Sequence, residues 1–267
     1  MILSSRWTRV AGLRIHDMHS SRATGLPIVM LHGLAVSHRY LLPTARALAG
    51  RHPVLVPDLP GFGRSAKPPA AYAVSRHAEH LSTWLDTLGL RRVCVVGHSF
   101  GAEVAARLAV LRPDAVAALV LASPTCDPDA RTRTALIGRW LRDLTVEQPW
   151  QAPILARDVA DAKPWRVFAT ISHSVRNRIE DDLRRTRARP LVLGGSLDPV
   201  APLRWRARLA AMTGGTHVTV PEAAHNVLTT SPRRSAAAIA AHIRAHPGVD
   251  APPCVSDSSA ARWAASP

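Results

Sequence analysis

Cysteine is scarce in this chain, and its scarcity excludes two kinds of stabilisation. The 267 residues contain three cysteines, Cys94, Cys126 and Cys254. They are too few and too scattered for a disulfide framework, and they lack the paired spacing of a zinc site. We therefore expect Cys94 to belong to the core and the other two to be free thiols.

Long apolar runs are also missing. The longest uninterrupted one is AVAALVLA at residues 115–122, far short of the roughly 18 residues that cross a bilayer. The first twenty residues carry arginine and polar side chains where a secretory signal needs an apolar stretch. The sequence thus predicts no membrane span and a cytoplasmic protein.

Acidic residues are outnumbered, which gives a formal net charge of +15. Lys67 and Lys163 are the only lysines among the 34 basic residues, so nearly all of the excess is arginine. Nucleic-acid binding requires basic residues gathered on one face. Here they are scattered along the chain, so we predict that the protein does not bind nucleic acid.

The remaining composition is that of one large globular domain, because 47% of the residues are hydrophobic. Short apolar runs bounded by glycine or proline predict strands, and they alternate with stretches of helical periodicity. This alternation predicts an α/β, doubly wound, mostly parallel sheet with helices on both faces. The expected strands lie within 7–19 (a hairpin), 27–33, 52–58, 92–98, 116–123, 189–195 and 216–221, and the expected helices within 75–88, 100–111, 202–213 and 231–246.

One region interrupts the alternation. Residues 124–187 contain no good strand but carry apolar residues at helical spacing, which predicts a helical cap inserted between two parts of the core, 1–123 and 188–246. Residues 247–267 are rich in Pro, Ser and Ala and have no apolar periodicity, so this tail is expected to be disordered.

A serine stands at a junction between a predicted strand and a predicted helix, in the segment VCVVGHSFGAEVAARLA. A sharp turn of this kind exposes a serine hydroxyl and brings strand and helix so close that small residues are needed on both sides. Gly97 and Gly101 flank Ser99 in this way. The pattern is typical of a nucleophilic serine.

A nucleophilic serine needs a base, and the base needs an orienting acid. Asp198 follows the strand in LVLGGSLDPVAP, and His225 follows the next strand in VTVPEAAHNV. The chain order serine, aspartate, histidine fits an α/β architecture. Asp127 and Asp129, nearer the end of an earlier strand, remain rival candidates for the acid.

With these motifs the chain resembles the α/β-hydrolase superfamily over residues 7–246, in particular its cap-bearing esterase, lipase and lactonase-like members. Besides GHSFG at 97–101, LHGLA at 31–35 is similar to the family's oxyanion loop and DLPGFGRS at 58–65 to its glycine-rich segment. The resemblance implies Ser99 as nucleophile, His225 as general base and acid, and Asp198 as the residue that orients the imidazole. It also implies an oxyanion hole formed by the backbone N–H groups of Leu34 and Phe100.

Other residues are expected to support the site or the substrate rather than react. Structural roles are expected for His32, Gly33, Gly97, His98 and Gly101, and Asp58 is expected to fix the glycine-rich loop. Trp140, Trp165 and Phe168 of the cap are candidates for an apolar substrate pocket. No dinucleotide or phosphate-loop fingerprint appears and the histidines lack metal-site spacing, so neither a cofactor nor a metal is expected.

The sequence thus predicts a serine hydrolase, monomeric or homodimeric, that cleaves a carboxylic ester, thioester or lactone of a small to medium apolar substrate. Family members with an aspartate nucleophile, the dehalogenases and epoxide hydrolases, are disfavoured because Ser99 holds that position. Carbon–carbon bond hydrolases, haloperoxidases and acyltransferases use the same three residues and stay open as alternatives. So does a ligand-binding receptor of hydrolase fold that does not turn over.

Overall fold

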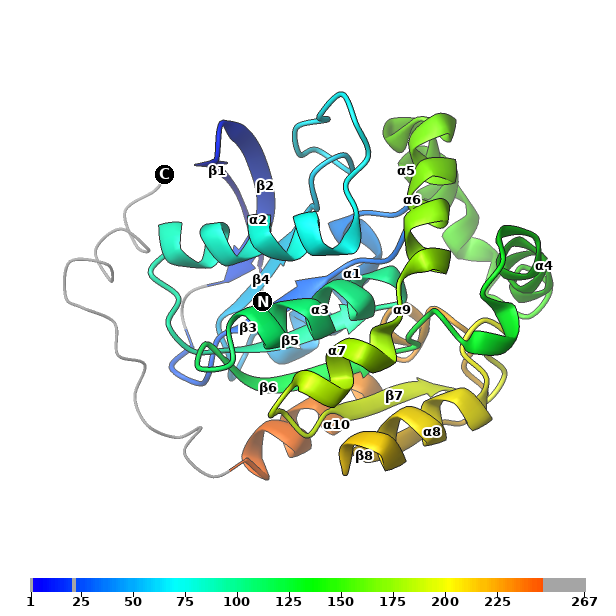
Figure 1. Ribbon diagram of the computed structural model, residues 1–267. Coiled ribbons are helices and arrows are strands. Elements are labelled where there is room, and N and C mark those ends of the chain that lie inside the picture. Colours follow the sequence, from blue (N-terminus) through cyan, green and yellow to red (C-terminus); the bar gives the residue numbers. More distant parts are fainter. Residues whose placement is uncertain (1, 21–22, 247–267) are drawn as a thin grey trace.

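The structure is a computed structural model that describes residues 2–20 and 23–246. One eight-stranded sheet runs through it in the order β1-β2-β4-β3-β5-β6-β7-β8 (Figure 1). The strands are β1 (Ser4–Val10), β2 (Leu13–Ser20), β3 (Ile28–Leu31), β4 (Val54–Pro57), β5 (Val93–His98), β6 (Val116–Ala122), β7 (Leu191–Gly195) and β8 (Thr216–Val220).

Helices connect most of the strands. They are α1 (His38–Leu48), α2 (Val74–Thr87), α3 (Phe100–Leu111), α4 (Arg133–Asp143), α5 (Ala152–Ala162), α6 (Pro164–Arg176), α7 (Ile179–Arg185), α8 (Leu203–Thr213), α9 (Val227–Thr230) and α10 (Pro232–Arg244), with short 3-10 turns at Pro128–Ala130 and Pro149–Gln151.

The sheet is parallel from β4 to β8, and the β1–β2 hairpin adds an antiparallel edge. The order β4-β3-β5 reverses the direction in which the sheet grows. Ligands bind at such switch points, beyond the carboxyl ends of the parallel strands. The predicted α/β class is confirmed, and this end of β5 is where a site is expected.

Strand β5 shows why the sheet is buried on both sides. Val93 and Val95 pack into the core on the side of α2 and α3, whereas Cys94 and Val96 pack on the side of α1 and α10. Because neighbouring strand residues point to opposite faces, a strand covered on both sides needs a continuous apolar run. The expected core position of Cys94 agrees with its complete burial.

Helix α1 is absent from the sequence-based expectations. Its segment HRYLLPTARAL contains Pro43 in the middle, and a proline there removes a helical hydrogen bond. The helix forms because its apolar face, with Tyr40, Leu41 and Leu48, packs on the sheet. The side chain of Ser37 caps its first turn by accepting a hydrogen bond from the Arg39 amide.

Between β6 and β7 the chain forms helices α4–α7 and no strand, as the sequence predicts. Helices α4, α5 and α6 stand together at one end of the molecule, at the right of Figure 1. In contrast, α7 packs against α3 and α8 and extends the layer on the sheet. The expected disorder of 247–267, together with Cys254, concerns residues outside the described part.

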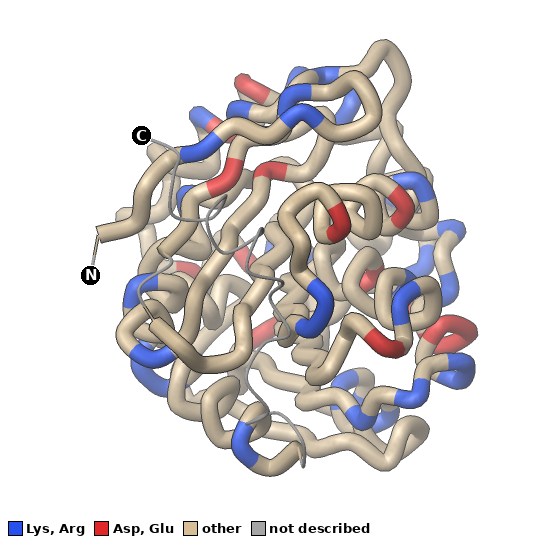
Figure 2. The backbone as a smooth tube through the Cα atoms, turned by 90° about the vertical axis from the view of Figure 1, so that its left-hand side faces the viewer, with Lys and Arg blue, Asp and Glu red and all other residues tan. Residues whose placement is uncertain are grey.

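Within the described residues, no helix is both long and apolar enough to cross a membrane. In the backbone view of Figure 2, the positions of basic residues are spread along the chain, with acidic positions between them. Cys126 is a free thiol, as expected. It is also buried, and its thiol donates to the Ser174 carbonyl near the C-terminal end of α6.

Glu103 on α3 is a completely buried carboxyl group that joins the sheet layer to α6. Its Oε1 accepts from the hydroxyls of Thr125 and Ser174, and its Oε2 accepts from the Asn177 amide at 2.9 Å. Burial favours the neutral acid more than these hydrogen bonds favour the anion, so the pKa of Glu103 is raised to about 7.

Glu103→Gln is expected to gain stability over the wild type as the pH rises. The pKa of Glu103 in the folded state lies above its ordinary value of 4.5, so the wild type loses stability between about pH 4.5 and pH 8, while the amide does not titrate. The difference in unfolding free energy should change by up to about 3 kcal/mol in this window. Urea unfolding from pH 5 to 8 measures it.

Glu79→Gln on α2 is the control, because that carboxylate is half exposed. Parallel pH dependences for wild type and Glu103→Gln would contradict the explanation.

Candidate functional site

The site is built on the turn between β5 and α3. Ser99 has φ 55° and ψ −121°, a strained combination for a residue with a side chain. The turn is tight enough that a Cβ on Gly97 would lie 2.2 Å from the Gly101 carbonyl oxygen, and one on Gly101 would lie 2.5 Å from the Leu31 carbonyl oxygen. The two glycines therefore permit the close approach that holds Ser99 at the junction.

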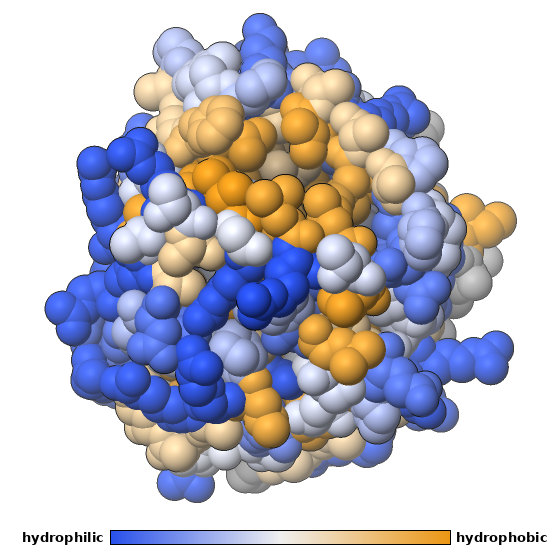
Figure 3. Space-filling view, turned by 90° about the vertical axis from the view of Figure 1, so that its right-hand side faces the viewer, coloured by the Kyte–Doolittle hydropathy of each residue, from blue (hydrophilic) through white to orange (hydrophobic). Residues whose placement is uncertain are grey.

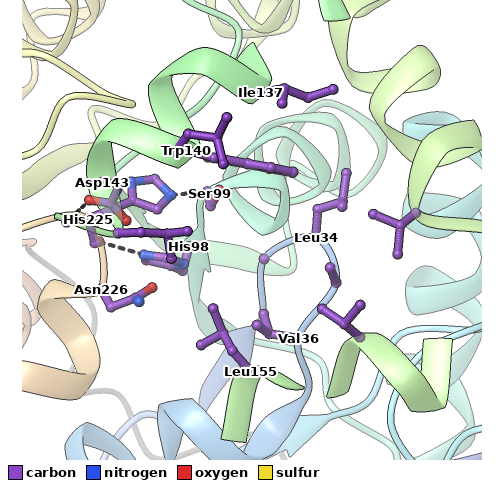
Figure 4. A pocket seen from close by; sticks show the side chains of 16 residues that line it. Leu34, Val36, His98, Ser99, Ile137, Trp140, Asp143, Leu155, His225 and Asn226 are labelled. Atoms are coloured by element: carbon purple, nitrogen blue, oxygen red, sulfur yellow. Dashed lines mark hydrogen bonds between the residues drawn. The ribbon is translucent and has the colours of Figure 1, made fainter. Parts of the chain in front are cut away.

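The structure brings Ser99, His225 and Asp198 together from three loops at the carboxyl ends of β5, β8 and β7. His225 Nε2 lies 3.0 Å from Ser99 Oγ (Figure 4). On the other side of the ring, His225 Nδ1 lies 3.1 and 3.2 Å from the two Asp198 oxygens. All three residues are buried. This is the geometry in which a histidine can take a proton from serine while a carboxylate fixes the ring.

Electrostatics favour a charged carboxylate and an easily protonated imidazole. Burial raises the pKa of Asp198, but His225 and the backbone amides of Val200 and Ala201, both at 2.9 Å, outweigh it and lower that pKa. Burial likewise lowers the pKa of His225, and the Asp198 carboxylate outweighs it and raises that pKa. The pair is therefore suited to stabilise an imidazolium that forms during a reaction.

The rival acids lie elsewhere. Asp127 accepts from Arg139 at 2.7 Å and caps the short turn at Pro128–Ala130, and Asp129 is exposed and pairs with Arg204. Neither contacts His225. Of these three carboxylates, Asp198 is the one that is hydrogen-bonded to the His225 ring.

Phe100 and Leu34, the two residues expected to form the oxyanion hole, both lie near Ser99. Phe100 is the first residue of α3, where amides have no partner within the helix. Leu34 follows β3 and lines the same cavity as Ser99. Both residues therefore lie at the cavity, and their role as an oxyanion hole stays a prediction.

A buried hydrogen-bonded chain links the loop after β3 to the loop that carries His225. The Gly33 amide donates to the Tyr40 hydroxyl at 2.8 Å, which lies 2.6 Å from His98 Nδ1. His98 Nε2 lies 2.9 Å from the His225 carbonyl oxygen. Because a carbonyl only accepts, His98 carries its proton on Nε2 and receives the Tyr40 hydroxyl on Nδ1. Burial lowers the pKa of His98 to about 3, which keeps it neutral.

His32 supports the same loop from below. Its Nδ1 donates to the Gly33 carbonyl at 2.7 Å, and its Nε2 accepts from the Leu59 amide at 2.9 Å. It therefore joins the loop after β3 to the loop after β4 and does not touch Ser99.

Among the described residues, one group of side chains lies close enough to hold a metal ion: His16, His38 and Asp58. Both histidines place Nδ1 2.9 Å from the Asp58 carboxylate, which also accepts from the backbone amides of His38 and Arg64. These hydrogen bonds account for the cluster without an ion. They place Asp58 between β2, α1 and the glycine-rich loop.

A cavity of about 310 Å³ opens beside Ser99 beneath α4, α5 and α6. Its wall is mostly apolar, and Figure 3, which views the molecule from this side, shows hydrophobic residues around a hollow. The residues lining it are Gly33, Leu34, Ala35, Val36, His98, Ser99, Ile137, Trp140, Leu141, Asp143, Leu144, Leu155, Val159, Val167, His225 and Asn226.

Of the three aromatic residues predicted for the pocket, only Trp140 lines it. Trp165 and Phe168 are about half exposed, at 48% and 58%, so their placement in the pocket was wrong. They are three residues apart on α6 and share one face of that helix. Val167 and the buried Ile171, on another face, point inward instead.

Sequence reasoning missed two carboxyl groups of the cap. Asp143, the last residue of α4, accepts from the His225 backbone amide at 3.3 Å, and Glu147 accepts from the backbone amide of Asn226. Burial raises the pKa of Asp143 to about 7, against the opposing effect of His225. Only the spacing of four residues in DLTVE could have hinted at them, and that spacing is common on helices.

The comparisons with known proteins identify the family. The model of the alpha/beta hydrolase fold matches residues 27–160, and that of the TAP-like proteins matches residues 164–246. The first match covers half of the chain. The protein belongs to the alpha/beta hydrolase fold family, and hydrolases are among its relatives.

Two curated relatives illustrate this. A haloalkane dehalogenase of Mycobacterium marinum is 39% identical over 125 residues, which is 46% of this chain and 42% of the relative. A putative carbamate hydrolase of Pseudomonas savastanoi pv. phaseolicola is 37% identical over 116 residues, 43% of this chain and 45% of the relative. The chain thus matches less than half the length of either.

Solved structures resemble almost the whole chain in fold. The match to a membrane phospholipase A, described as a bacterial virulence factor, covers 91% of this chain and 86% of the phospholipase chain, with TM-score 0.78 and 23% identity. The match to an esterase of Thermogutta terrifontis covers 90% of this chain and 98% of the esterase, with TM-score 0.76 and 23% identity. At this identity the likeness establishes the fold.

Asp198→Asn should slow the reaction of Ser99 with an organophosphonate probe by about 10³-fold or more, because the amide no longer stabilises the imidazolium or fixes its tautomer. Asp127→Asn is the matched control and should react within a few-fold of the wild type. Mass spectrometry of the Ser99 adduct over time gives both rates. If Asp127→Asn reacted slowly while Asp198→Asn reacted at the wild-type rate, Asp127 and not Asp198 would be the acid.

Proposed function

We propose that the protein is a serine hydrolase that cleaves a carboxylic ester, thioester or lactone carrying a small to medium apolar acyl group. The observation that carries this proposal is the hydrogen-bonded series Ser99, His225 and Asp198 at the wall of an apolar cavity. Fold alone does not choose a chemistry. The proposal therefore depends on the residues at the site.

In this mechanism Ser99 Oγ attacks the substrate carbonyl carbon while His225 Nε2 takes its proton. Negative charge then develops on the carbonyl oxygen, and the amides of Leu34 and Phe100 stabilise it. One such donor contributes roughly 3 kcal/mol in a protease case. His225 protonates the leaving alcohol, thiol or ring oxygen, and a water activated by the same histidine then releases the acid from Ser99.

The cavity favours an apolar acyl group of limited size. Its volume of about 310 Å³ lies at the lower end of the range for small-molecule pockets. Leu34, Ile137 and Trp140 contribute apolar wall. Burying an apolar acyl chain against this wall is favourable because it removes apolar surface from water. Leu141 and Leu144 line the cavity and are also exposed, so they form part of its entrance.

The residue at the nucleophile position favours ester hydrolysis over the activity named for the dehalogenase relative. Family members with dehalogenase activity have an aspartate as nucleophile, whereas this chain has Ser99 at that position. Ser99 instead forms an acyl-enzyme, and this intermediate is common to esters, thioesters and lactones.

The wild type is expected to turn over p-nitrophenyl esters with an optimum at a short to medium acyl chain. Ser99→Ala should lower kcat by about 10⁴-fold or more, because the nucleophile is lost while the fold is kept. Steady-state rates across the acyl series, with mass spectrometry of the intermediate, measure both.

Different results would support other activities. A stoichiometric burst without turnover would favour acyl transfer to another acceptor or ligand capture. Full activity in Ser99→Ala would exclude the proposed mechanism.

A further inference from the structure

The end of helix α4 reaches over to the loop that carries His225. Asp143 Oδ1 lies 3.3 Å from the His225 backbone nitrogen, and Glu147 accepts from the next amide, that of Asn226. The two carboxylates are four residues apart and thus hold two consecutive amides of one loop. Ile137 and Trp140, earlier on the same helix, form part of the cavity wall.

The surroundings of Asp143 set it apart from an ordinary surface carboxylate. The residue is only 6% exposed and lines the cavity close to His225 (Figure 4). Apart from the His225 amide, no hydrogen-bond donor to its side chain is found in the described part of the chain. No arginine or lysine is paired with it there, in contrast to Asp127 and Asp158.

We propose that Asp143 is a positioning residue of the hydrolase: it holds His225 in place from the cap, and its charge stabilises the protonated imidazole. This inference rests on the proposed function, because it assigns Asp143 a role through the proposed base. The contact also makes the position of His225 depend on the position of α4. A movement of the cap away from the core would release the backbone of the base.

The charges around His225 come from several elements. Asp198 follows β7 and contacts the imidazole directly, whereas Asp143 and Glu147 belong to the cap. The neutral His98 also lies close, its ring centroid 4.9 Å from that of His225. Negative charge on Asp143 raises the pKa of the His225 imidazole, in the same direction as Asp198 and Glu147.

Asp143→Asn separates charge from hydrogen bonding, because the amide oxygen can still accept from the His225 amide. The reaction requires a neutral His225, so removing the negative charge should move the acid limb of the kcat/KM profile to lower pH, by roughly one unit. The plateau at high pH should stay within a few-fold of the wild type. Asp181→Asn, an exposed carboxylate on α7 paired with Arg178 and Arg184, is the matched control and should leave the limb unchanged.

Asp143→Ala removes both contributions. Its plateau kcat should fall about tenfold, with less change in KM, because the hydrogen bond that holds the base is lost. A thermal unfolding curve establishes that the variant is folded. If Asp143→Ala does not fold, the pH profile of Asp143→Asn alone tests the role of Asp143.

An NMR titration of the His225 ring in wild type, Asp143→Asn and Asp181→Asn gives the same comparison without any substrate. A lower imidazole pKa in Asp143→Asn supports the inference even if no ester is turned over, so its failure and that of the proposed function are distinguishable. Titration curves of wild type and Asp143→Asn that superimpose would overturn it.

Discussion

Strand β5 and helix α3 meet so closely at the turn around Ser99 that neither Gly97 nor Gly101 has room for a Cβ. This contact forces Ser99 to φ 55° and turns its side chain toward the cavity and not into the core. It also starts α3 directly after the serine, so the free N–H of Phe100 lies beside the hydroxyl. The remaining parts of the site are arranged around this turn. The strained backbone of Ser99 persists because the packed sheet around it stabilises this conformation.

The partners of Ser99 are held by polar groups that water does not reach. Neutral His98 donates to the His225 carbonyl and receives the Tyr40 hydroxyl, which in turn accepts from the Gly33 amide. Each group in this chain has its required donor or acceptor, and fully satisfied buried networks stabilise a single arrangement. The loop after β3 and the loop after β8 are thereby fixed relative to each other, although Gly33 and His225 are 192 positions apart in the chain.

The parts of the molecule that sequence reasoning could predict are those whose cause is local. Strand β5 has a continuous apolar run, the Ser99 turn requires its glycines, and Asp198 and His225 each follow a recognisable strand. Helix α1 was missed because Pro43 argues against it, and only packing on the sheet decides the outcome. Trp165 and Phe168 were misplaced because composition does not tell which face of α6 is turned inward. The contacts of Asp143 and Tyr40 join distant segments, and no local pattern reports them.

The two carboxyl groups near His225 differ because their surroundings differ. Asp198 accepts from two backbone amides as well as from the imidazole, so it stays ionised although it is buried. Asp143 has one weak backbone donor and an apolar cavity beside it, so the same burial raises its pKa to about 7. An apolar ligand in the cavity would displace water from the side of Asp143. The lower local dielectric strengthens any interaction between that carboxylate and the imidazole. The occupancy of the pocket and the basicity of His225 are in this way physically connected, through a residue that belongs to the cap and not to the loops that carry Ser99, Asp198 and His225.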